Sequence, residues 1–95
     1  MPKGYWIGRV TVNDPDTYPE YIKAGASVYE KFGGVFVVRG GQCESLEGNN
    51  KTRNVVVEWP DYATAKAAYE SPEYQTAKAI RERCADADFL IVEGV

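Results

Sequence analysis

The order of secondary-structure signals is the feature that most constrains this chain of 95 residues. Runs rich in β-branched and aromatic residues cover 5–12, 35–39, 53–59 and 89–93, and such runs are typical of strands. Apolar residues recur at spacings of three and four over 18–32, 62–69 and 74–84, as they do in amphipathic helices. The sequence therefore predicts the order β-α-β-β-α-β, which is the split βαβ or ferredoxin-like arrangement of an α+β protein with an antiparallel sheet.

Residues that commonly cap helices mark the predicted helix ends. Asp14 is placed to cap the first helix and Asp61 the second. Ser71-Pro72 signals a new helical start, so the second helical region is expected to divide there. Gly33-Gly34 is expected to end the first helix in the left-handed conformation that glycine allows.

Several positions are expected in the core between the helices and the sheet. Gly25 lies inside the first apolar stripe, where glycine costs a helix about 1 kcal/mol relative to alanine, so we expect a close approach to the sheet there. Tyr74 stands at helical spacing from Ala77, which favours the core, although its phenol could also reach a pocket. Trp6 and Trp59 are expected under the helices, or around a flat aromatic substrate.

Composition limits the class of protein. A chain of this length makes one domain, 1–95, and the net charge of −3 with scattered Lys and Arg argues against nucleic acid as a partner. No apolar run approaches the roughly 18 residues of a membrane span, and the N-terminus lacks a signal-peptide core, so we expect no membrane partner and a cytoplasmic location. Cys43 and Cys84 are far apart and form no CxxC pair, which favours two reduced thiols.

The chain contains no histidine. This absence removes the commonest general base, the Ser-His and Cys-His nucleophile pairs, and the commonest metal ligand. Hydrolase triads, His-ligated haem and His-rich metal sites are therefore excluded, and no metal or cofactor is expected.

Alternation along each strand divides the sheet into two faces. The face expected under the helices is wholly apolar and holds Trp6, Gly8, Val10, Val12, Phe36, Val38, Val55, Val57, Trp59, Leu90 and Val92. The other face carries isolated charges on an apolar background and holds Tyr5, Ile7, Arg9, Val35, Val37, Arg39, Asn54, Val56, Glu58, Phe89, Ile91 and Glu93. This second face is either the solvated side of an open sheet or the contact surface of a partner sheet. Its apolar area is large for a monomer, so a homodimer is expected.

The spatial order 4-1-3-2, usual for such sheets, predicts which polar residues lie together. It sets Arg9 and Glu58 on adjacent central strands near the same end. Arg39 is expected at the opposite end with three further polar residues, namely Asn54, Tyr5 and Glu93.

Short stretches spread over almost the whole length carry a resemblance to a known family. They are Lys3-Gly4-Tyr5-Trp6-Ile7, Gly33-Gly34, Val38-Arg39-Gly40-Gly41, Arg53-Asn54-Val55-Val56, Glu58-Trp59-Pro60, Ser71-Pro72-Glu73-Tyr74 and Val92-Glu93-Gly94. With them the chain resembles the family called domain of unknown function thirteen-thirty, within the dimeric α+β barrel superfamily. The resemblance implies a ferredoxin-like protomer whose sheet faces that of a second copy. Relatives in the superfamily include cofactor-free monooxygenases, muconolactone isomerase-like proteins, haem-dependent enzymes and stress-responsive proteins, and the missing histidine counts against the haem branch.

Arg39, followed by Gly40-Gly41, is the strongest candidate for a ligand-binding residue. Its guanidinium offers five donors suited to a carboxylate or enolate oxygen, and the glycines leave backbone amides open to a ligand. The alternative is a structural ion pair with Glu93 or Glu58. Those two carboxylates could act as general bases if burial raised their pKa values, whereas pairing with arginine would lower them.

The sequence therefore leaves two classes of function open. One is a non-catalytic dimer that binds a small anionic or aromatic molecule, and the other is a cofactor-free monooxygenase- or isomerase-like enzyme on an enolisable or aromatic substrate. In either case Arg39 is expected to organise the site, with the loop 40–52 over it as a lid. The candidate ligand-binding residues are Arg39, Asn54, Glu93, Tyr5, Tyr74, Glu58 and Arg9.

Overall fold

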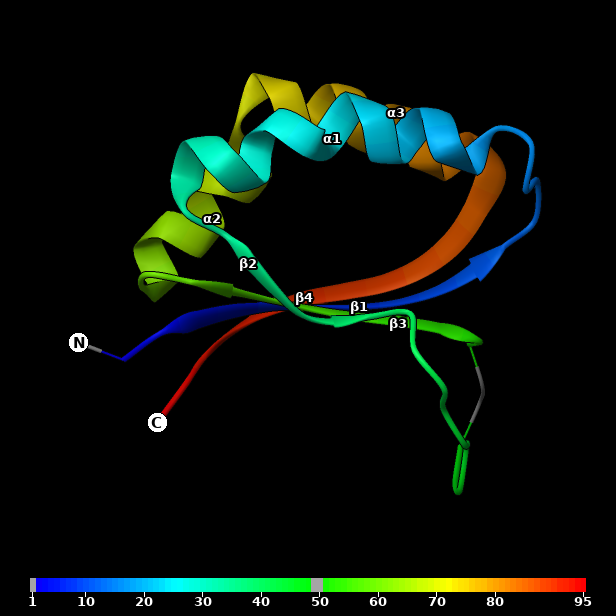
Figure 1. The fold of residues 1–95 in the computed structure, drawn as a ribbon, viewed down its shortest axis with the longest axis horizontal. Coiled ribbons are helices and arrows are strands. Elements are labelled where there is room, and N and C mark those ends of the chain that lie inside the picture. Colours follow the sequence, from blue (N-terminus) through cyan, green and yellow to red (C-terminus); the bar gives the residue numbers. More distant parts are fainter. Residues whose placement is uncertain (1, 49–50) are drawn as a thin grey trace.

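A four-stranded antiparallel sheet forms one layer of the protein and three helices form the other, in a computed structural model that describes residues 2–48 and 51–95 (Figure 1). The elements are β1 (Gly4–Val12), α1 (Tyr18–Phe32), β2 (Val35–Arg39), β3 (Arg53–Trp59), α2 (Tyr62–Glu70), α3 (Pro72–Cys84) and β4 (Ala85–Glu93). The strand order is β2-β3-β1-β4. The predicted ferredoxin-like arrangement is confirmed, with the second helical region divided at Ser71 as expected. No helix in the described part of the chain is long and apolar enough to span a membrane.

Most of the predicted helix ends are confirmed. The Asp61 carboxylate accepts a hydrogen bond from the Thr64 amide at 2.7 Å, and the Ser71 hydroxyl accepts one from the Tyr74 amide at 3.2 Å. Gly33 ends α1 with φ of 76°, in the left-handed region that favours glycine.

The predicted cap at Asp14 is wrong. The α1 helix begins at Tyr18, after Thr17, and Asp14 instead closes a turn ahead of the helix. Its carboxylate accepts hydrogen bonds from the Asp16 and Thr17 amides and from the Thr17 hydroxyl. Aspartate side chains commonly bond to the backbone two residues on, and here that turn takes the place of a capped first turn.

The core centres on Trp6, which is 1% exposed and packs against Trp59 and Tyr74. Its indole Nε1 donates a hydrogen bond to the Ala65 carbonyl at 2.8 Å, which ties β1 to α2. The predicted burial of these three aromatic residues is confirmed. The reason expected for Gly25 is wrong, because a Cβ there would meet Ala77 and Tyr74 of α3, not the sheet.

The register of β4 reverses the predicted assignment of its side chains. Trp6 pairs with Ile91 and Gly8 with Phe89, so these β4 residues lie on the helix-covered side. Leu90 and Val92 lie on the opposite face and are 51% and 41% exposed. The run 89–92 is apolar at every position, so it has no alternation of apolar and polar residues to predict which side chains face the helices.

A bulge in β2 moves Arg39 to the helix-covered side. Phe36 pairs with Val57 on that side, the register then shifts, and Arg39 pairs with Val55. Val38 consequently joins the open face beside Val56. The prediction of Arg39 on the open face and Val38 under the helices is therefore wrong, because one extra residue inverts every later side chain.

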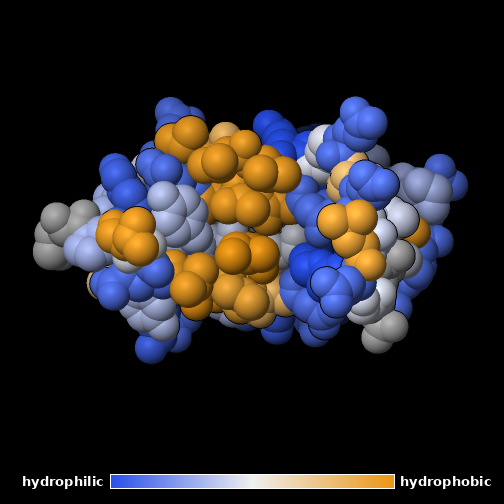
Figure 2. Space-filling model, turned by 90° about the horizontal axis from the view of Figure 1, so that it is seen from below, coloured by the Kyte–Doolittle hydropathy of each residue, from blue (hydrophilic) through white to orange (hydrophobic). Residues whose placement is uncertain are grey.

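The sheet face away from the helices carries a continuous apolar band, hereafter the open face (Figure 2). Its apolar side chains are Ile7, Val35, Val38, Val56, Leu90 and Val92. Val35 at 61% and Leu90 at 51% are the most exposed of these. Exposed apolar surface of this kind is uncommon on a monomer and marks interaction sites.

Candidate functional site

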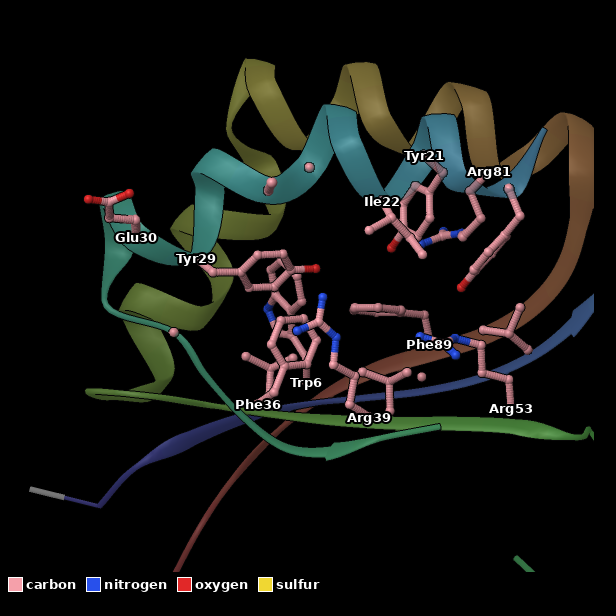
Figure 3. Close-up of a pocket in the computed structure, with 18 residues that line it drawn as sticks. Trp6, Tyr21, Ile22, Tyr29, Glu30, Phe36, Arg39, Arg53, Arg81 and Phe89 are labelled. Carbon is pink, nitrogen blue, oxygen red and sulfur yellow. The ribbon is translucent and has the colours of Figure 1, made fainter. Parts of the chain in front are cut away.

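A cavity of about 410 Å³ lies between α1 and the helix-covered side of the sheet (Figure 3). Aromatic side chains line it from both layers, with Tyr21 and Tyr29 from α1 and Trp6, Phe36 and Phe89 from three strands. Small residues also line it, namely Gly8, Gly25, Ala26 and Gly34. Because these positions carry little or no side chain, space remains between helix and sheet that a bulkier sequence would fill.

Three arginines face this cavity, each stacked on an aromatic ring. The guanidinium carbon of Arg39 lies 4.3 Å from the Phe36 ring centroid, and that of Arg53 lies 5.6 Å from the Tyr18 centroid. Arg81 lies 5.4 Å from the Phe89 centroid. Within residues 2–48 and 51–95, no ion pair includes any of the three. The buried Nε of Arg53 also has no hydrogen-bond acceptor in the same part of the chain.

Arg81 is the most unusual of the three because it is only 5% exposed. Its Nη1 donates a hydrogen bond to the Tyr74 hydroxyl at 2.7 Å, and the Tyr74 and Tyr21 hydroxyl oxygens lie 2.8 Å apart. A buried cation without a carboxylate partner is costly. Here the aromatic faces of Tyr21, Tyr74 and Phe89 and the Tyr74 oxygen offset part of that cost.

The direction of this hydrogen-bond chain follows from burial. Tyr74 is fully buried, and its oxygen already accepts from Arg81. If Tyr21 also donated to that oxygen, the Tyr74 proton would have no acceptor, at a cost of about 1–3 kcal/mol. The chain therefore runs from Arg81 through Tyr74 to Tyr21, and the Tyr21 proton is left for another acceptor.

Tyr18, Tyr29 and Tyr74 are held in their neutral form. Burial raises the pKa of Tyr18, with the Arg53 guanidinium opposing the shift. Burial likewise raises the pKa of Tyr29 and of Tyr74 well above the ordinary tyrosine range. The cavity therefore presents neutral hydroxyls and cationic guanidiniums, and Glu30 at its margin is the one carboxylate among its described lining residues.

The structure brings only part of the predicted site together. Arg39 lines the cavity, and Tyr74 lies behind its wall, joined to Tyr21. Asn54 is next to Arg39 through the backbone, since the Gly40 amide donates to the Asn54 carbonyl at 2.8 Å. The Asn54 position, however, pairs with Arg9 on the open face, so its side chain points away from the cavity.

The remaining candidates lie far from Arg39. Tyr5 pairs with Glu58 at the other end of the sheet, and its hydroxyl donates to the Glu58 carboxylate at 3.3 Å. The salt-bridge partner of Glu58 is Lys3, at 3.9 Å, and Glu93 pairs with Gly4 at that same end. The predicted neighbourhood of Arg39 with Tyr5 and Glu93 is therefore wrong.

The predicted juxtaposition of Arg9 and Glu58 is also wrong. Because β1 and β3 are antiparallel, residues late in both strands lie at opposite ends, and Arg9 pairs with Asn54 and Asp88 instead.

The loop 40–52 does not lie where a lid was expected. Its described residues project below the sheet, on the side away from the helices, while the cavity lies on the helix side (Figure 1). Residues 49 and 50 lie outside the described residues. Past them, Lys51 forms an ion pair with Asp88 on the open face at 3.2 Å.

Sequence reasoning missed Arg81, Arg53 and Tyr21 as cavity residues. A signal for Arg81 was present: with Tyr74, Ala77 and Cys84 it forms a stripe at spacings of seven, four and three, and all four are buried. An apolar residue is the ordinary occupant of a buried helical position, and Ile80, next to Arg81 in the sequence, offers one.

These features define a ferredoxin-like α+β protein with an aromatic cavity lined by arginines that have no carboxylate partner in the described part of the chain. The chain belongs to the family described as Domain of unknown function (DUF1330), whose model matches residues 3–95. No curated protein sequence matches the chain.

Solved structures with the same fold are similar over nearly the full length. A protein of unknown function from Rhodopseudomonas palustris is 20% identical with a TM-score of 0.74, covering 99% of this chain and 83% of that one. A dimeric ferredoxin-like protein of unknown function from Thermobifida fusca is 19% identical with a TM-score of 0.65, covering 97% and 91%. SnoaB, a cofactor-independent oxygenase from Streptomyces nogalater, is 16% identical with a TM-score of 0.63, covering 97% and 92%. Likeness at these identities establishes the fold alone.

Proposed function

We propose that this protein binds a small aromatic anion in the cavity between α1 and the sheet. The observation that carries the proposal is the set of three arginines that line an aromatic cavity without a carboxylate partner in the described chain. The cavity volume of about 410 Å³ lies in the range of small-molecule sites, roughly 300–1,000 Å³. A planar acid would place its ring against the aromatic wall and its charge against a guanidinium.

The test is a calorimetric titration with aromatic acids, such as benzoate and 2-naphthoate, and with their neutral amides. We expect the acids to bind more tightly than the amides. Arg39→Gln should weaken acid binding by about 10-fold or more, because a hydrogen bond to a charged group contributes about 1.5–3 kcal/mol. Arg83→Gln is the matched control, since Arg83 is an exposed arginine of α3 that does not line the cavity. Equal affinity for acids and amides, or unchanged binding by Arg39→Gln, contradicts the proposal.

A second candidate is a cofactor-free monooxygenase- or isomerase-like enzyme acting on an enolisable or aromatic substrate. It is favoured by the similarity of the fold to SnoaB, a cofactor-independent oxygenase. In this role Arg39 would stabilise developing negative charge on a substrate oxygen, where the loss of one donor can cost roughly 3 kcal/mol of barrier. Oxygen consumption with polycyclic phenols, without added cofactor and in the presence of a chelator, tests the oxygenase activity. Absence of both turnover and rearranged product removes this candidate.

We further propose that the protein acts as a homodimer whose two open faces pack together. The exposed apolar side chains of that face support this arrangement, and the Thermobifida fusca protein of the same fold is dimeric. Sedimentation at micromolar concentration should give twice the monomer mass of 10.6 kDa. Leu90→Asp should shift the protein to monomer, whereas Tyr62→Asp on exposed α2 should not, and a monomeric wild type contradicts the proposal. A cytoplasmic location, expected from the sequence, stays part of this proposal.

A further inference from the structure

The hydroxyl of Tyr21 ends a hydrogen-bond chain that begins at a buried cation and reaches the cavity. Its oxygen accepts from Tyr74, which in turn accepts from Arg81. The Tyr21 side chain lines the cavity beside Tyr29, and a hydrogen bond between these two hydroxyls contributes to the raised pKa of Tyr29. A ligand oxygen that enters the cavity can replace Tyr29 as the partner of the Tyr21 hydroxyl.

The charge at this end of the cavity favours an anionic acceptor. The Arg81 cation donates into the chain and polarises each successive hydroxyl, which makes the terminal Tyr21 proton a stronger donor. Figure 3 shows Arg81 beside Tyr21, with Arg53 on the sheet below them. The Tyr18 ring, 5.6 Å from the Arg53 guanidinium carbon, packs on the Tyr21 ring with 5.4 Å between centroids. Arg81 therefore acts on the oxygen that meets Tyr21 through the hydrogen-bond chain, and Arg53 is a second cation that lines the same cavity.

The geometry of the donor distinguishes one kind of anion. A single hydroxyl directs one proton at one oxygen, whereas a carboxylate suits the paired donors of a guanidinium fork such as Arg39. If the ligand oxygen is bonded directly to a planar ring, that ring can lie against the aromatic side chains of Phe89 and Trp6. The ring centroids of these two residues are 5.2 Å apart. Hydrogen bonds from a hydroxyl to an ionised oxygen are short and strong.

We propose that Tyr21 is the specificity-determining donor of this cavity and that it selects an ionised phenol or enol oxygen of the ligand. This proposal rests on the proposed binding of an aromatic anion and names the anionic group. In it, Tyr74 and Arg81 are positioning residues: they do not meet the ligand oxygen but fix the direction in which Tyr21 donates.

The probes are 4-nitrophenol, 4-nitrobenzoate and 4-nitroanisole, which share a ring and differ in the oxygen presented. The visible absorbance of 4-nitrophenolate reports the ionisation state of the bound phenol directly. We expect wild-type protein to lower the pKa of bound 4-nitrophenol by about one unit or more, because the site stabilises the charged form. Affinity for 4-nitroanisole should be much weaker than for the phenolate.

Three variants separate the role of Tyr21 from general effects. Tyr21→Phe should lower the affinity for 4-nitrophenolate about 10- to 100-fold, with a change of less than about 3-fold for 4-nitroanisole. Tyr74→Phe keeps the ring and breaks the chain, so it should reduce the preference for phenolate by a smaller factor. Tyr62→Phe is the control, because Tyr62 is exposed on α2 and remote from the cavity.

The outcomes distinguish this inference from the proposed function. If the protein binds neither the phenol nor the benzoate, both proposals fail. If it binds 4-nitrobenzoate but does not lower the pKa of the phenol, or if Tyr21→Phe leaves that pKa shift unchanged, the Tyr21 proposal alone is overturned. If Tyr21→Phe does not fold, Tyr74→Phe decides: an unchanged preference for phenolate overturns the proposal, and a reduced one supports it.

Discussion

Replacing Gly25 with alanine should stabilise the protein, although glycine at this position faces another helix. A Cβ built at Gly25 lies 3.5 Å from the Ala77 Cβ and 4.0 Å from the Tyr74 Cδ1, which are ordinary van der Waals distances. Gly25 lies in the middle of α1, where alanine is favoured by about 1 kcal/mol. The added methyl group also reduces the freedom of the unfolded chain. We therefore expect the free energy of unfolding to rise by about 0.5–1 kcal/mol.

The same substitution at Gly34 should have the opposite effect. A Cβ there lies 2.7 Å from the Cη2 and Cζ3 atoms of Trp59, a side chain that is 1% exposed and held in the core. The indole or the backbone between α1 and β2 would have to move. Overpacking of this kind costs about 1–3 kcal/mol. Gly34→Ala is thus a matched control in which one methyl group is added at a site without room.

Urea unfolding at a fixed protein concentration measures both variants. The concentration must be held constant because dimerisation would add to the apparent stability. For a domain of this size, 1 kcal/mol corresponds to about 4–8 °C in Tm, so both changes are measurable by heat as well. If the slope of the free energy of unfolding against urea concentration is unchanged, the variant and wild-type proteins have comparable unfolded states. Destabilisation by Gly25→Ala of 1 kcal/mol or more would show that α1 and α3 leave no room for a methyl group at this position.

Three further predictions concern single side chains. Ser71→Ala should lower the free energy of unfolding by about 1–2 kcal/mol, as measured by urea, because its hydroxyl both caps α3 and donates to the Ala68 carbonyl at 2.7 Å; no loss would show that the cap is replaceable. Hydrogen bonds from Thr64 hold the pKa of Asp61 below its ordinary value. The contribution of the Asp61 carboxylate to the free energy of unfolding is therefore complete above the unfolded pKa of about 3.9, and it is lost as the pH falls through the folded pKa. Asp61→Asn should therefore flatten the fall of Tm on acidification below about pH 4, and an identical pH profile contradicts this. In native protein a thiol reagent should modify exposed Cys43 quickly and Cys84 only on unfolding, since Cys84 is 1% exposed and burial raises its pKa; fast modification of both contradicts the structure.

Much of the architecture was predictable from sequence because local rules determine it. Strand runs, helical stripes and the caps at Asp61 and Ser71 depend on residues a few positions apart, and the structure has them where the pattern predicts. The burial of Trp6, Trp59 and Tyr74 follows from the same patterns. The family match over residues 3–95 agrees with the resemblance found in the motifs.

The candidate site was less predictable, because it depends on pairings between distant residues. Arg39 is predicted from the sequence as a binding residue, but the bulge between Phe36 and Val38 decides which face it occupies. The antiparallel register of β1 with β3 separates Tyr5 and Glu58 from Arg39 and brings Arg9 beside Asn54. Neither the bulge nor the register is encoded in a local spacing.

The tertiary structure alone decided where the cavity lies and which charges face it. Arg81 stands with Tyr74 on a stripe of α3 whose burial the helical period allowed, yet only the packing of α3 against α1 brings this pair to Tyr21. Sequence patterns assign a charged side chain to solvent because burying it alone is costly. In the folded protein that cost is offset by aromatic faces and a hydroxyl contributed from two helices and a strand, and such compensation exists only after the elements have packed.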